Sequence, residues 1–317
     1  MFHGNFLALR AFRDLEDLLG SLRFQKSTHR SMRHSIFSAL FVIMIPIFLQ
    51  AGEPALPVRV LSFNLRYINP GDTGELTWLA RRDQAAQVIR EDKADVIGLQ
   101  EAFRSMLDDI AVRVPGYEEI GVGREDGKTT GEYAAILVKK DRFNVMDSGT
   151  FWLSDTPTVP NSATWKNRVT RICSWAKLEE RTTKRLLFFY NTHLDHESQE
   201  AREKGVAMIL DHIAALPEDT AVIFTGDFNA AEDNPAISNI KISPRRMLDT
   251  WRELNPTVPL TESGTMSLFT GVHDTAKIDY IFVPAGTRVV DAEIIRKNHD
   301  GIYPSDHYPV RASVEFH

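Results

Sequence analysis

The sequence is almost free of cysteine. Cys173 is the only one among 317 residues, so no disulfide can form within the chain. Without cysteine ligands and without an H-E-x-x-H helix, the common zinc sites are disfavoured. A G-x-S-x-G turn is also absent, so nothing indicates a serine hydrolase. The fold must therefore be stabilised by its hydrophobic core, and a chain of about 300 residues buries roughly three quarters of its unfolded surface.

Linkers, repeats and low-complexity tracts are absent beyond residue 60. The composition, with 43% hydrophobic and 25% charged residues, is that of a globular protein. The chain has 37 basic and 43 acidic residues, and six of the basic and three of the acidic ones lie in the first 51 positions. The remaining residues therefore hold 31 basic and 40 acidic side chains, which gives a net charge of −9. Such a body as a whole does not attract nucleic acid, although a local basic groove is compatible with it.

A long apolar run lies near the N-terminus. Residues 36–49 form a charge-free apolar run of fourteen residues. Arg30, Arg33 and His34 precede it, and small residues suited to cleavage, Ala51 and Gly52, follow it. This layout predicts a secretory signal peptide over residues 32–51, and with it a periplasmic or secreted protein. The run is short for a bilayer span, so an uncleaved anchor is the alternative and the only membrane association expected.

Residues 1–31 make a long leader before that basic region, which is unusual for a signal peptide. Met32 immediately precedes Arg33, so we interpret residues 1–31 as a dispensable leader or a mis-annotated extension upstream of the natural start. Helical spacing of apolar residues over 6–22 leaves an amphipathic helix open as the alternative.

Six short clusters of Asn, Asp, Glu or His adjoin strand-like apolar runs. A single acid beside a strand is usually a cap or a turn residue. Six clusters rich in carboxylate, carboxamide and imidazole instead indicate one site assembled at strand ends. Because the clusters reach from residue 64 to residue 307, one site places residues 57–317 in one domain. The clusters centre on Asn64, on Glu101, on His193, on Asp227 with Asn229, on Asp279, and on Asp306 with His307.

The apolar patterns predict a mixture of strands and helices. Strand and helix alternate at the start, several strands follow one another in the middle, and strand and helix alternate again. That order predicts an α+β (α/β) fold of two packed sheets with outer helices, since a purely parallel sheet would alternate more strictly. We expect helices over residues 78–91, 102–112 and 200–216, and strands over 58–63, 95–99, 133–138, 143–153, 171–178, 186–190, 221–224, 278–283, 288–295 and 310–316.

The clusters resemble those of a known superfamily. FNLR, LQE, NTHLDH, GDFN, IDYIFV and SDHYPV occur over residues 57–317 in the order and approximate spacing of the endonuclease/exonuclease/phosphatase superfamily, which includes DNase I-like nucleases, sphingomyelinases and inositol phosphatases. RYINPGD and FWLS resemble an exported bacterial branch. The resemblance implies a four-layer αββα sandwich of two packed mixed β-sheets with outer helices. It also implies a divalent metal, Mg²⁺ or Mn²⁺, and phosphoester hydrolysis.

The resemblance and the residue types assign the metal ligands. Mg²⁺ prefers oxygen ligands, and Glu101, at the end of a buried strand, is the first candidate; a helix N-terminal acid is the alternative. Asp306 is the second carboxylate on the metal side. Asn64 would hold Glu101, the metal or the phosphate through its amide. Arg66 stands where some relatives carry an acidic ligand, so we expect it to contact phosphate, and its charge argues against a two-metal site.

Acid/base chemistry needs a group that titrates near neutrality, and His307 is the best candidate. By resemblance, Asp279 orients it. Asp227 would position or deprotonate the attacking water, and Asn229 would hydrogen-bond both the phosphate and Asp227. His193 should donate to a phosphoryl oxygen as negative charge builds there.

Further residues are predicted to contact the substrate or to support these groups. Glu132 would orient the imidazole of the NTHLDH cluster, with a turn acid as the alternative. Asp195 and His196 extend that cluster as substrate contacts, or else form a loop salt bridge. Arg171 and Trp152 would line a cleft for a sugar or a base. Aromatic residues on strands are otherwise core residues.

Together these assignments predict an exported, divalent-metal-dependent phosphoester hydrolase, either a phosphodiesterase or a phosphatase. The expected substrate is a small phosphodiester or a sugar or lipid phosphate, and a secreted nuclease that degrades DNA or RNA is the alternative. A binding protein that keeps the fold without the chemistry is a minor alternative. Such a protein would be expected to have lost a core site residue, and all are present. No stable protein partner is implied.

Overall fold

The computed structural model describes residues 55–317. The predicted leader and signal peptide, residues 1–51, lie outside the described residues. Within residues 55–317, no helix is both long enough and apolar enough to cross a membrane.

The first β-sheet joins the two ends of the described chain. In residues 55–317 it holds six strands in the order β11-β12-β1-β2-β4-β3. β1 and β2 are parallel and the other neighbours are antiparallel, so the sheet is mixed. Its strands are β1 (Leu56–Asn64), β2 (Val96–Ala102), β3 (Tyr117–Ile120), β4 (Tyr133–Lys139), β11 (Arg288–Ile294) and β12 (Val310–Phe316).

The second β-sheet comes from one continuous stretch, residues 143–284. Its strand order is β5-β6-β7-β8-β10-β9, and β7 and β8 are its parallel pair. The other neighbours are antiparallel, so this sheet is also mixed. Its strands are β5 (Phe143–Trp152), β6 (Ile172–Glu180), β7 (Leu186–His193), β8 (Ala221–Asp227), β9 (Met247–Asp249) and β10 (Asp279–Pro284).

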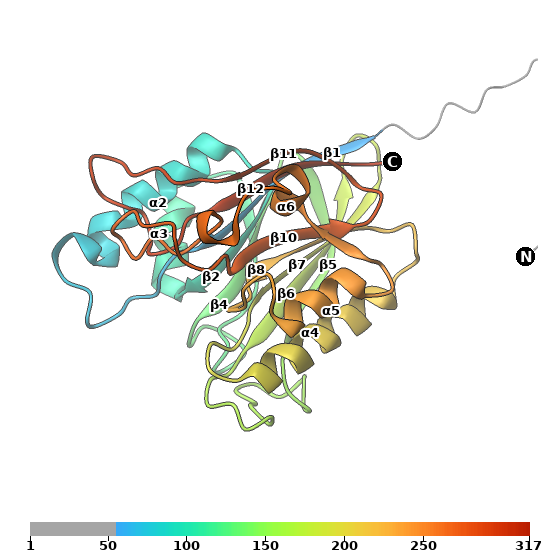
Figure 1. Ribbon diagram of the computed structural model, residues 1–317, viewed down its shortest axis with the longest axis horizontal. Coiled ribbons are helices and arrows are strands. Elements are labelled where there is room, and N and C mark those ends of the chain that lie inside the picture. The colour runs from blue at the N-terminus through green and yellow to red at the C-terminus, as the bar shows by residue number, and fades with distance from the viewer. Residues whose placement is uncertain (1–54) are drawn as a thin grey trace, which may run out of the picture. The chain divides into compact units, whose positions relative to one another are not determined.

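Helices cover the outer face of each sheet (Figure 1). α2 (Trp78–Asp92) and α3 (Arg104–Arg113) pack on the first sheet, and α4 (Gln199–Ala214) and α5 (Pro235–Ile242) pack on the second. Ser198 caps α4 by accepting a hydrogen bond from Ala201 N, and Asn234 caps α5 in the same way from Ala236 N. The remaining helical segments are α6 (Thr250–Leu254) and the 3₁₀ turns η1 (Gly74–Leu76) and η2 (Leu260–Glu262).

Three hydrophobic clusters separate the four layers. Alternate residues of a strand point to opposite faces, so Phe189 of β7 packs between the sheets while Tyr190 packs toward α4 and α5. The cluster between the sheets also contains Val60 and Ile281, one from each sheet. Ile89 of α2 belongs to the third cluster, under the helices of the first sheet. The predicted four-layer αββα sandwich of two mixed sheets is therefore confirmed.

Each sheet contains one β-helix-β unit around its parallel pair. β1, α2 and β2 form the unit of the first sheet, and β7, α4 and β8 form that of the second. Parallel strands end at the same edge of a sheet. Asn64 and Glu101 therefore leave the first sheet together, and His193 lies opposite Asp227 at the end of the second. The fold thus presents two pairs of polar residues, one from each sheet.

A buried polar contact ties the sheets together just below these strand ends. Asn191 of β7 donates through Nδ2 to the carbonyl oxygens of Leu99 (2.9 Å) and Ala135 (2.8 Å) in the first sheet. Its Oδ1 accepts a hydrogen bond from Gln100 Nε2 at 2.7 Å. Gly98 leaves the room for this contact, because a Cβ there would lie 2.6 Å from Asn191 Oδ1.

The predicted strands and helices are all present, with small shifts at their ends. The prediction missed β3, β9, α5 and α6, which are short. The helix predicted over 102–112 begins at Arg104, because β2 continues through Ala102. Burial on α2 does not follow residue polarity alone, because Leu79 is exposed whereas Arg81 is fully buried.

Candidate active site

The polar strand ends and their adjoining loops line one cleft of about 410 Å³. That volume suits a small molecule. The predicted catalytic and metal-binding residues that line it are Glu101, His193, Asp227, Asn229, Asp306 and His307. The predicted substrate contacts that line it are Arg66, Glu132, Arg171 and His196.

Asn64 links the two sheets at the base of the cleft. Its side chain is buried, and Nδ2 donates to Glu101 Oε1 at 3.1 Å and to Asp227 Oδ2 at 2.9 Å. Its Oδ1 accepts from the backbone N–H of Arg66 at 2.8 Å. Asn64 therefore holds the two carboxylates in fixed positions, one on each sheet, as predicted for Glu101.

The backbone of Glu101 is bent to aim its carboxylate into the cleft. The pairing of β2 with β4 shifts register between Leu99 and Ala102, and Glu101 has a φ of 61°. A non-glycine residue in this conformation at a strand end is a mark of a functional site. Oε2 accepts the backbone N–H of Tyr67 at 2.9 Å. Because Glu101 lies in β2, the helix N-terminal alternative for this residue does not apply.

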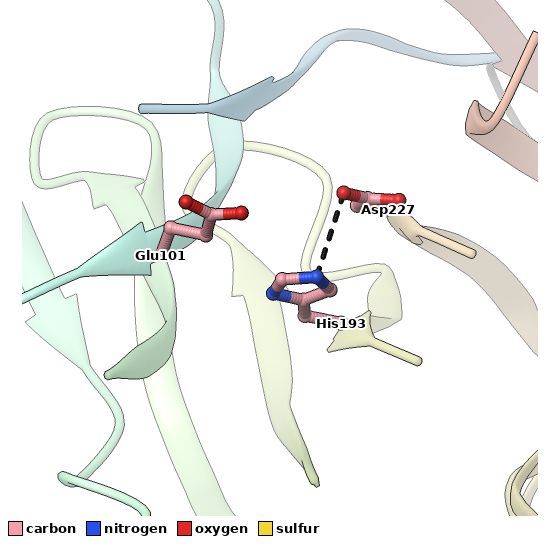
Figure 2. Close-up of side chains that lie close together, drawn as sticks. All are labelled: Glu101, His193 and Asp227. Carbon is pink, nitrogen blue, oxygen red and sulfur yellow. Dashed lines mark ion pairs between the residues drawn. The ribbon is translucent and has the colours of Figure 1, made fainter. Parts of the chain in front are cut away.

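Glu101, His193 and Asp227 converge from three strands, as Figure 2 shows. One possible ligand atom from each lies within 4.8 Å of the others. Asp306 adds a further carboxylate to the lining of the same cleft. Oxygen donors dominate this set, which fits Mg²⁺ or Mn²⁺ better than softer metals. The residues present therefore suit the divalent cation predicted from the sequence.

His307 and Asp279 form the predicted buried pair. The Nδ1 of His307 lies 2.9 Å from Asp279 Oδ2. Burial alone would lower the pKa of His307, but the charge and hydrogen bond of Asp279, together with the Asp227 and Asp306 charges, raise this pKa well above its ordinary value. The imidazole is therefore held protonated, with Nδ1 on Asp279 and Nε2 free to face the cleft.

Asp227 lies between the two imidazoles. Its Oδ2 is 3.5 Å from His193 Nε2 and 3.9 Å from His307 Nε2, and its Oδ1 accepts the backbone N–H of Asn229 at 2.9 Å. Burial raises the pKa of Asp227, and the neighbouring Asp279 charge raises it further. The side chain of Asn229 donates to the Leu194 carbonyl at 3.0 Å, so Asn229 fixes the turn after β8 as well as lining the cleft.

His193 carries no charge in this setting. Burial and the charges of Arg171 and Arg124 lower the pKa of His193 well below its ordinary value. Its Nδ1 lies 3.7 Å from Glu132 Oε2, and Arg124 binds the Glu132 carboxylate with two contacts of 2.7 and 2.8 Å. Glu132 therefore lies near His193, but its oxygens are bound by Arg124 and within residues 55–317 it makes no hydrogen bond that would orient the imidazole, so its predicted orienting role stays a prediction. The prediction missed Arg124, although the Gly-rich segment GREDGKTTGE holds both members of this charge pair.

Arg66 forms ion pairs with two carboxylates. It contacts Asp306 Oδ2 at 3.2 Å and binds Asp72 with two contacts of 3.1 Å. Its backbone carbonyl accepts a hydrogen bond from the buried Arg81 at 2.6 Å, and Arg81 also donates to Pro304 O at 3.0 Å. Arg81 thus joins the Arg66 loop to the loop that carries Asp306. Sequence reasoning missed this role because an arginine on an amphipathic helix normally faces solvent.

Comparison with known proteins agrees with this geometry. Residues 61–307 match the sequence model of the Endonuclease/Exonuclease/phosphatase family. The chain belongs to this family. It is similar to the endonuclease/exonuclease/phosphatase from Bacteroides vulgatus, with 33% identity and a TM-score of 0.76 over 83% of this chain and 100% of that one. It also resembles the mannosyl-6-phosphatase of Bacteroides thetaiotaomicron VPI-5482, with 30% identity and a TM-score of 0.74 over 81% of this chain and 99% of that one.

A curated relative of the family is tyrosyl-DNA phosphodiesterase 2 of Danio rerio. It is 26% identical over 163 residues, which cover 50% of this chain and 38% of that protein. The chain spans about a third of the length of the curated relatives that it matches.

Two predicted substrate contacts of this family member lie outside the cleft lining. Asp195 is buried ahead of α4, where Oδ1 accepts the backbone N–H groups of Glu197 and Ser198 at 2.8 and 2.7 Å. It shapes the entry to the helix and does not reach the cleft. Trp152 is a core residue whose Nε1 donates to the Arg124 carbonyl at 2.7 Å. The Trp152 donor and the Asp195 Oδ1 are thus bound by backbone groups, whereas Asp195 Oδ2 is buried without a hydrogen-bond partner among residues 55–317.

Proposed function

We propose that this family member is an exported, divalent-metal-dependent phosphoester hydrolase that acts on a small phosphorylated molecule. The observation that carries the proposal is the His307–Asp279 pair facing Asp227 across a cleft that also holds Glu101. This arrangement offers a cationic donor, a carboxylate base and a metal-side carboxylate within one small volume. Phosphoester hydrolysis needs charge neutralisation, a directed water and a stabilised leaving group, and the cleft has a group for each.

Glu101 and Asp306 are the proposed ligands of the metal, and Asn64 fixes the first of them. A bound Mg²⁺ or Mn²⁺ supplies positive charge that polarises a phosphoryl oxygen. Arg66 pairs with Asp306 and places a second positive group beside the same carboxylate. We propose one metal, because Arg66 already places a positive charge on Asp306.

Asp227 and the two histidines handle the protons and the developing charge. Asp227 accepts a proton from the attacking water, since burial raises its pKa toward neutrality. His307, held protonated by Asp279, donates its Nε2 proton to the ester oxygen as the bond from that oxygen to phosphorus breaks, so the leaving group departs as an alcohol. His193 adds a donor on the other side of Asp227, where negative charge builds in the transition state.

A sugar phosphate or another small phosphate is the preferred substrate. The similar mannosyl-6-phosphatase from Bacteroides thetaiotaomicron aligns over 99% of its length, and the cleft has the size of a small-molecule site. The net charge of −9 beyond the first 51 residues opposes association with a long polyanion. A nuclease is the second candidate, because tyrosyl-DNA phosphodiesterase 2 is also a relative.

A substrate panel in Mg²⁺ and in Mn²⁺ tests this proposal. The panel holds plasmid DNA, RNA, a bis-aryl phosphate, an aryl monophosphate, mannose 6-phosphate and sphingomyelin. Hydrolysis of the small phosphates well above that of the nucleic acids supports it. Preferred cleavage of DNA or RNA would replace it by the nuclease. Binding of phosphate without hydrolysis of any ester would indicate a binding protein with the same fold.

A further inference from the structure

The guanidinium of Arg66 is divided between two carboxylates that have different places in the site. Nε and NH2 bind the two oxygens of Asp72, each at 3.1 Å. The third nitrogen, NH1, lies 3.2 Å from Asp306 Oδ2. Asp306 lines the cleft and is a proposed metal ligand, whereas Asp72 is not among the residues that line the cleft. Arg66 therefore joins a metal-side carboxylate to a carboxylate behind the cleft wall.

The backbone of Arg66 is held by two hydrogen bonds. Its N–H donates to Asn64 Oδ1 at 2.8 Å, and its carbonyl accepts from Arg81 NH2 at 2.6 Å. Its φ of 56° lies in the left-handed region, which a non-glycine residue keeps only where the surrounding structure enforces it. The side chain is 23% exposed and lines the cleft. Only the side chain of Arg66 is therefore free to change partners when the cleft is filled.

Three carboxylates act on this guanidinium. The hydrogen bonds with Asp72 raise the pKa of Arg66 most, and the charges of Asp306 and Glu101 raise it further. Glu101 and Asp306 are the proposed metal ligands, so the guanidinium lies beside the same negative charge that a divalent cation would need. Two positive groups that share a carboxylate repel each other, and each weakens the binding of the other. Arg66 is therefore a competitor of the metal at Asp306.

We propose that Arg66 gives up Asp306 to the metal, and that Asp72 is the positioning residue that keeps the guanidinium at the cleft after this exchange. This role rests on the proposed metal-dependent hydrolysis. Nε and NH2 stay on Asp72, because a paired contact between a planar guanidinium and a carboxylate is stronger than the single contact with Asp306. NH1 is then free for a phosphoryl oxygen of the substrate. With Asp306 as its only partner, Arg66 would instead obstruct the carboxylate that the metal uses.

Calorimetric titration of the full chain with Mg²⁺ or Mn²⁺ alone tests this exchange. Arg66→Gln removes the competing charge, so we expect the metal to bind roughly tenfold more tightly, while kcat/KM on an aryl monophosphate falls with the lost phosphate contact. Asp72→Asn leaves Arg66 with Asp306 as its remaining ion-pair partner, so we expect roughly tenfold weaker metal binding. Asp72→Glu, which keeps the charge but shifts the paired contact, should bind the metal with an affinity between those of Asp72→Asn and wild type.

Two further variants separate this role from a general effect of charge. Glu75→Gln removes one negative charge from an exposed position three residues beyond Asp72, and it should bind the metal as wild type does. The double variant Arg66→Gln/Asp72→Asn should match the metal affinity of Arg66→Gln within about twofold, because Asp72 acts through the guanidinium. A further loss as large as that of Asp72→Asn alone would show that Asp72 acts by its own charge, and would overturn the inference.

Weaker or unchanged metal binding by Arg66→Gln would also overturn the inference, since no competition would then exist. Wild-type protein that binds the metal but hydrolyses no ester would overturn the proposed function instead, and the metal affinities would still decide the roles of Arg66 and Asp72. Wild-type protein that binds neither cation would overturn both. If Asp72→Asn melts at a much lower temperature than wild type, the comparison with the double variant is made with Asp72→Glu.

Discussion

Asp279 of β10 lies directly opposite Asp227 of β8 in the antiparallel ladder, and the imidazole of His307 faces both carboxylates. Two buried acids so close together repel each other, and a protonated imidazole between them relieves the repulsion. The charge of Asp279 therefore raises the pKa of both Asp227 and His307.

The first prediction concerns the pH profile of hydrolysis at saturating Mg²⁺. Activity needs ionised Asp227, whose pKa is raised to about 7, so it should fall as the pH drops through that value. Activity also needs protonated His307, whose pKa is raised, so it should fall again at alkaline pH. Asp279→Asn removes a charge that raises both pKa values. Both limbs of the profile should therefore move to lower pH, and a profile that keeps its alkaline limb would contradict this account.

The second prediction concerns the coupling of His307 and Asp279. His307→Ala should lower kcat by about 10²–10⁴-fold, as expected for loss of a proton donor. Adding Asp279→Asn to this variant should cost little more, because Asp279 acts through the imidazole. His273→Ala, at an exposed position, is the matched control. Effects that multiply in the double variant would show that the two residues act independently.

The third prediction concerns the metal. Glu101→Gln keeps the shape of the side chain and the contact with Asn64 but removes the charge. We expect Mg²⁺ affinity, measured by calorimetry, and kcat/KM to fall together, and by more than the roughly 10–100-fold typical of an outer-shell partner. Glu118→Gln, on the exposed side of β3, should behave as wild type. Full activity in EDTA would refute the metal assignment.

The fourth prediction concerns the contact between the sheets. Gly98→Ala would place a Cβ 2.6 Å from Asn191 Oδ1, so the sheets must separate locally. Overpacking of this kind costs about 1–3 kcal/mol, which lowers the melting temperature by roughly 2–4 °C for each kcal/mol. Gly71→Ala, in an exposed loop, should melt as wild type does. Unchanged melting of Gly98→Ala would show that the buried contact adapts.

The fifth prediction concerns export. The apolar run over residues 36–49 predicts a mature protein that begins near Gly52 outside the cytoplasm. N-terminal sequencing of the protein from its natural host measures this directly. Recovery of the intact leader from a cytosolic fraction would contradict the prediction.

The polar strand ends were predictable from the sequence because each one combines a strong local pattern with an unusual residue type. Asp227 follows four apolar or small residues of a buried strand. Asp306 and His307 stand just before the last strand of the chain. Their meeting in one cleft followed from the resemblance, because spacing along a chain does not fix which strands become neighbours. The missed β3 illustrates the limit: its four residues include two glutamates, and tertiary pairing with β4 makes it a strand.

The residues that support the site were harder to predict than the residues that form it. From the sequence, Arg81 is expected to be a surface residue. The carbonyl oxygens that accept its hydrogen bonds come together only in the folded loops around it. Asp195 stands next to a catalytic-looking motif, but one oxygen of its carboxylate, Oδ1, accepts backbone N–H groups ahead of α4. In both residues the decisive partners are backbone groups, which have no residue-specific pattern in a sequence.

The pairing of β1 with β12 makes the first sheet depend on the C-terminal end of the chain. Residues 143–284 contain the strands of the second sheet, whereas the first sheet needs its last strand, β12, beside β1. Until that strand arrives, β1 has an open edge, and His307 has not joined the site. A copy that is cut short before residue 307 lacks a neighbour of β1 and the imidazole together, so we expect truncated chains to lack the proposed activity.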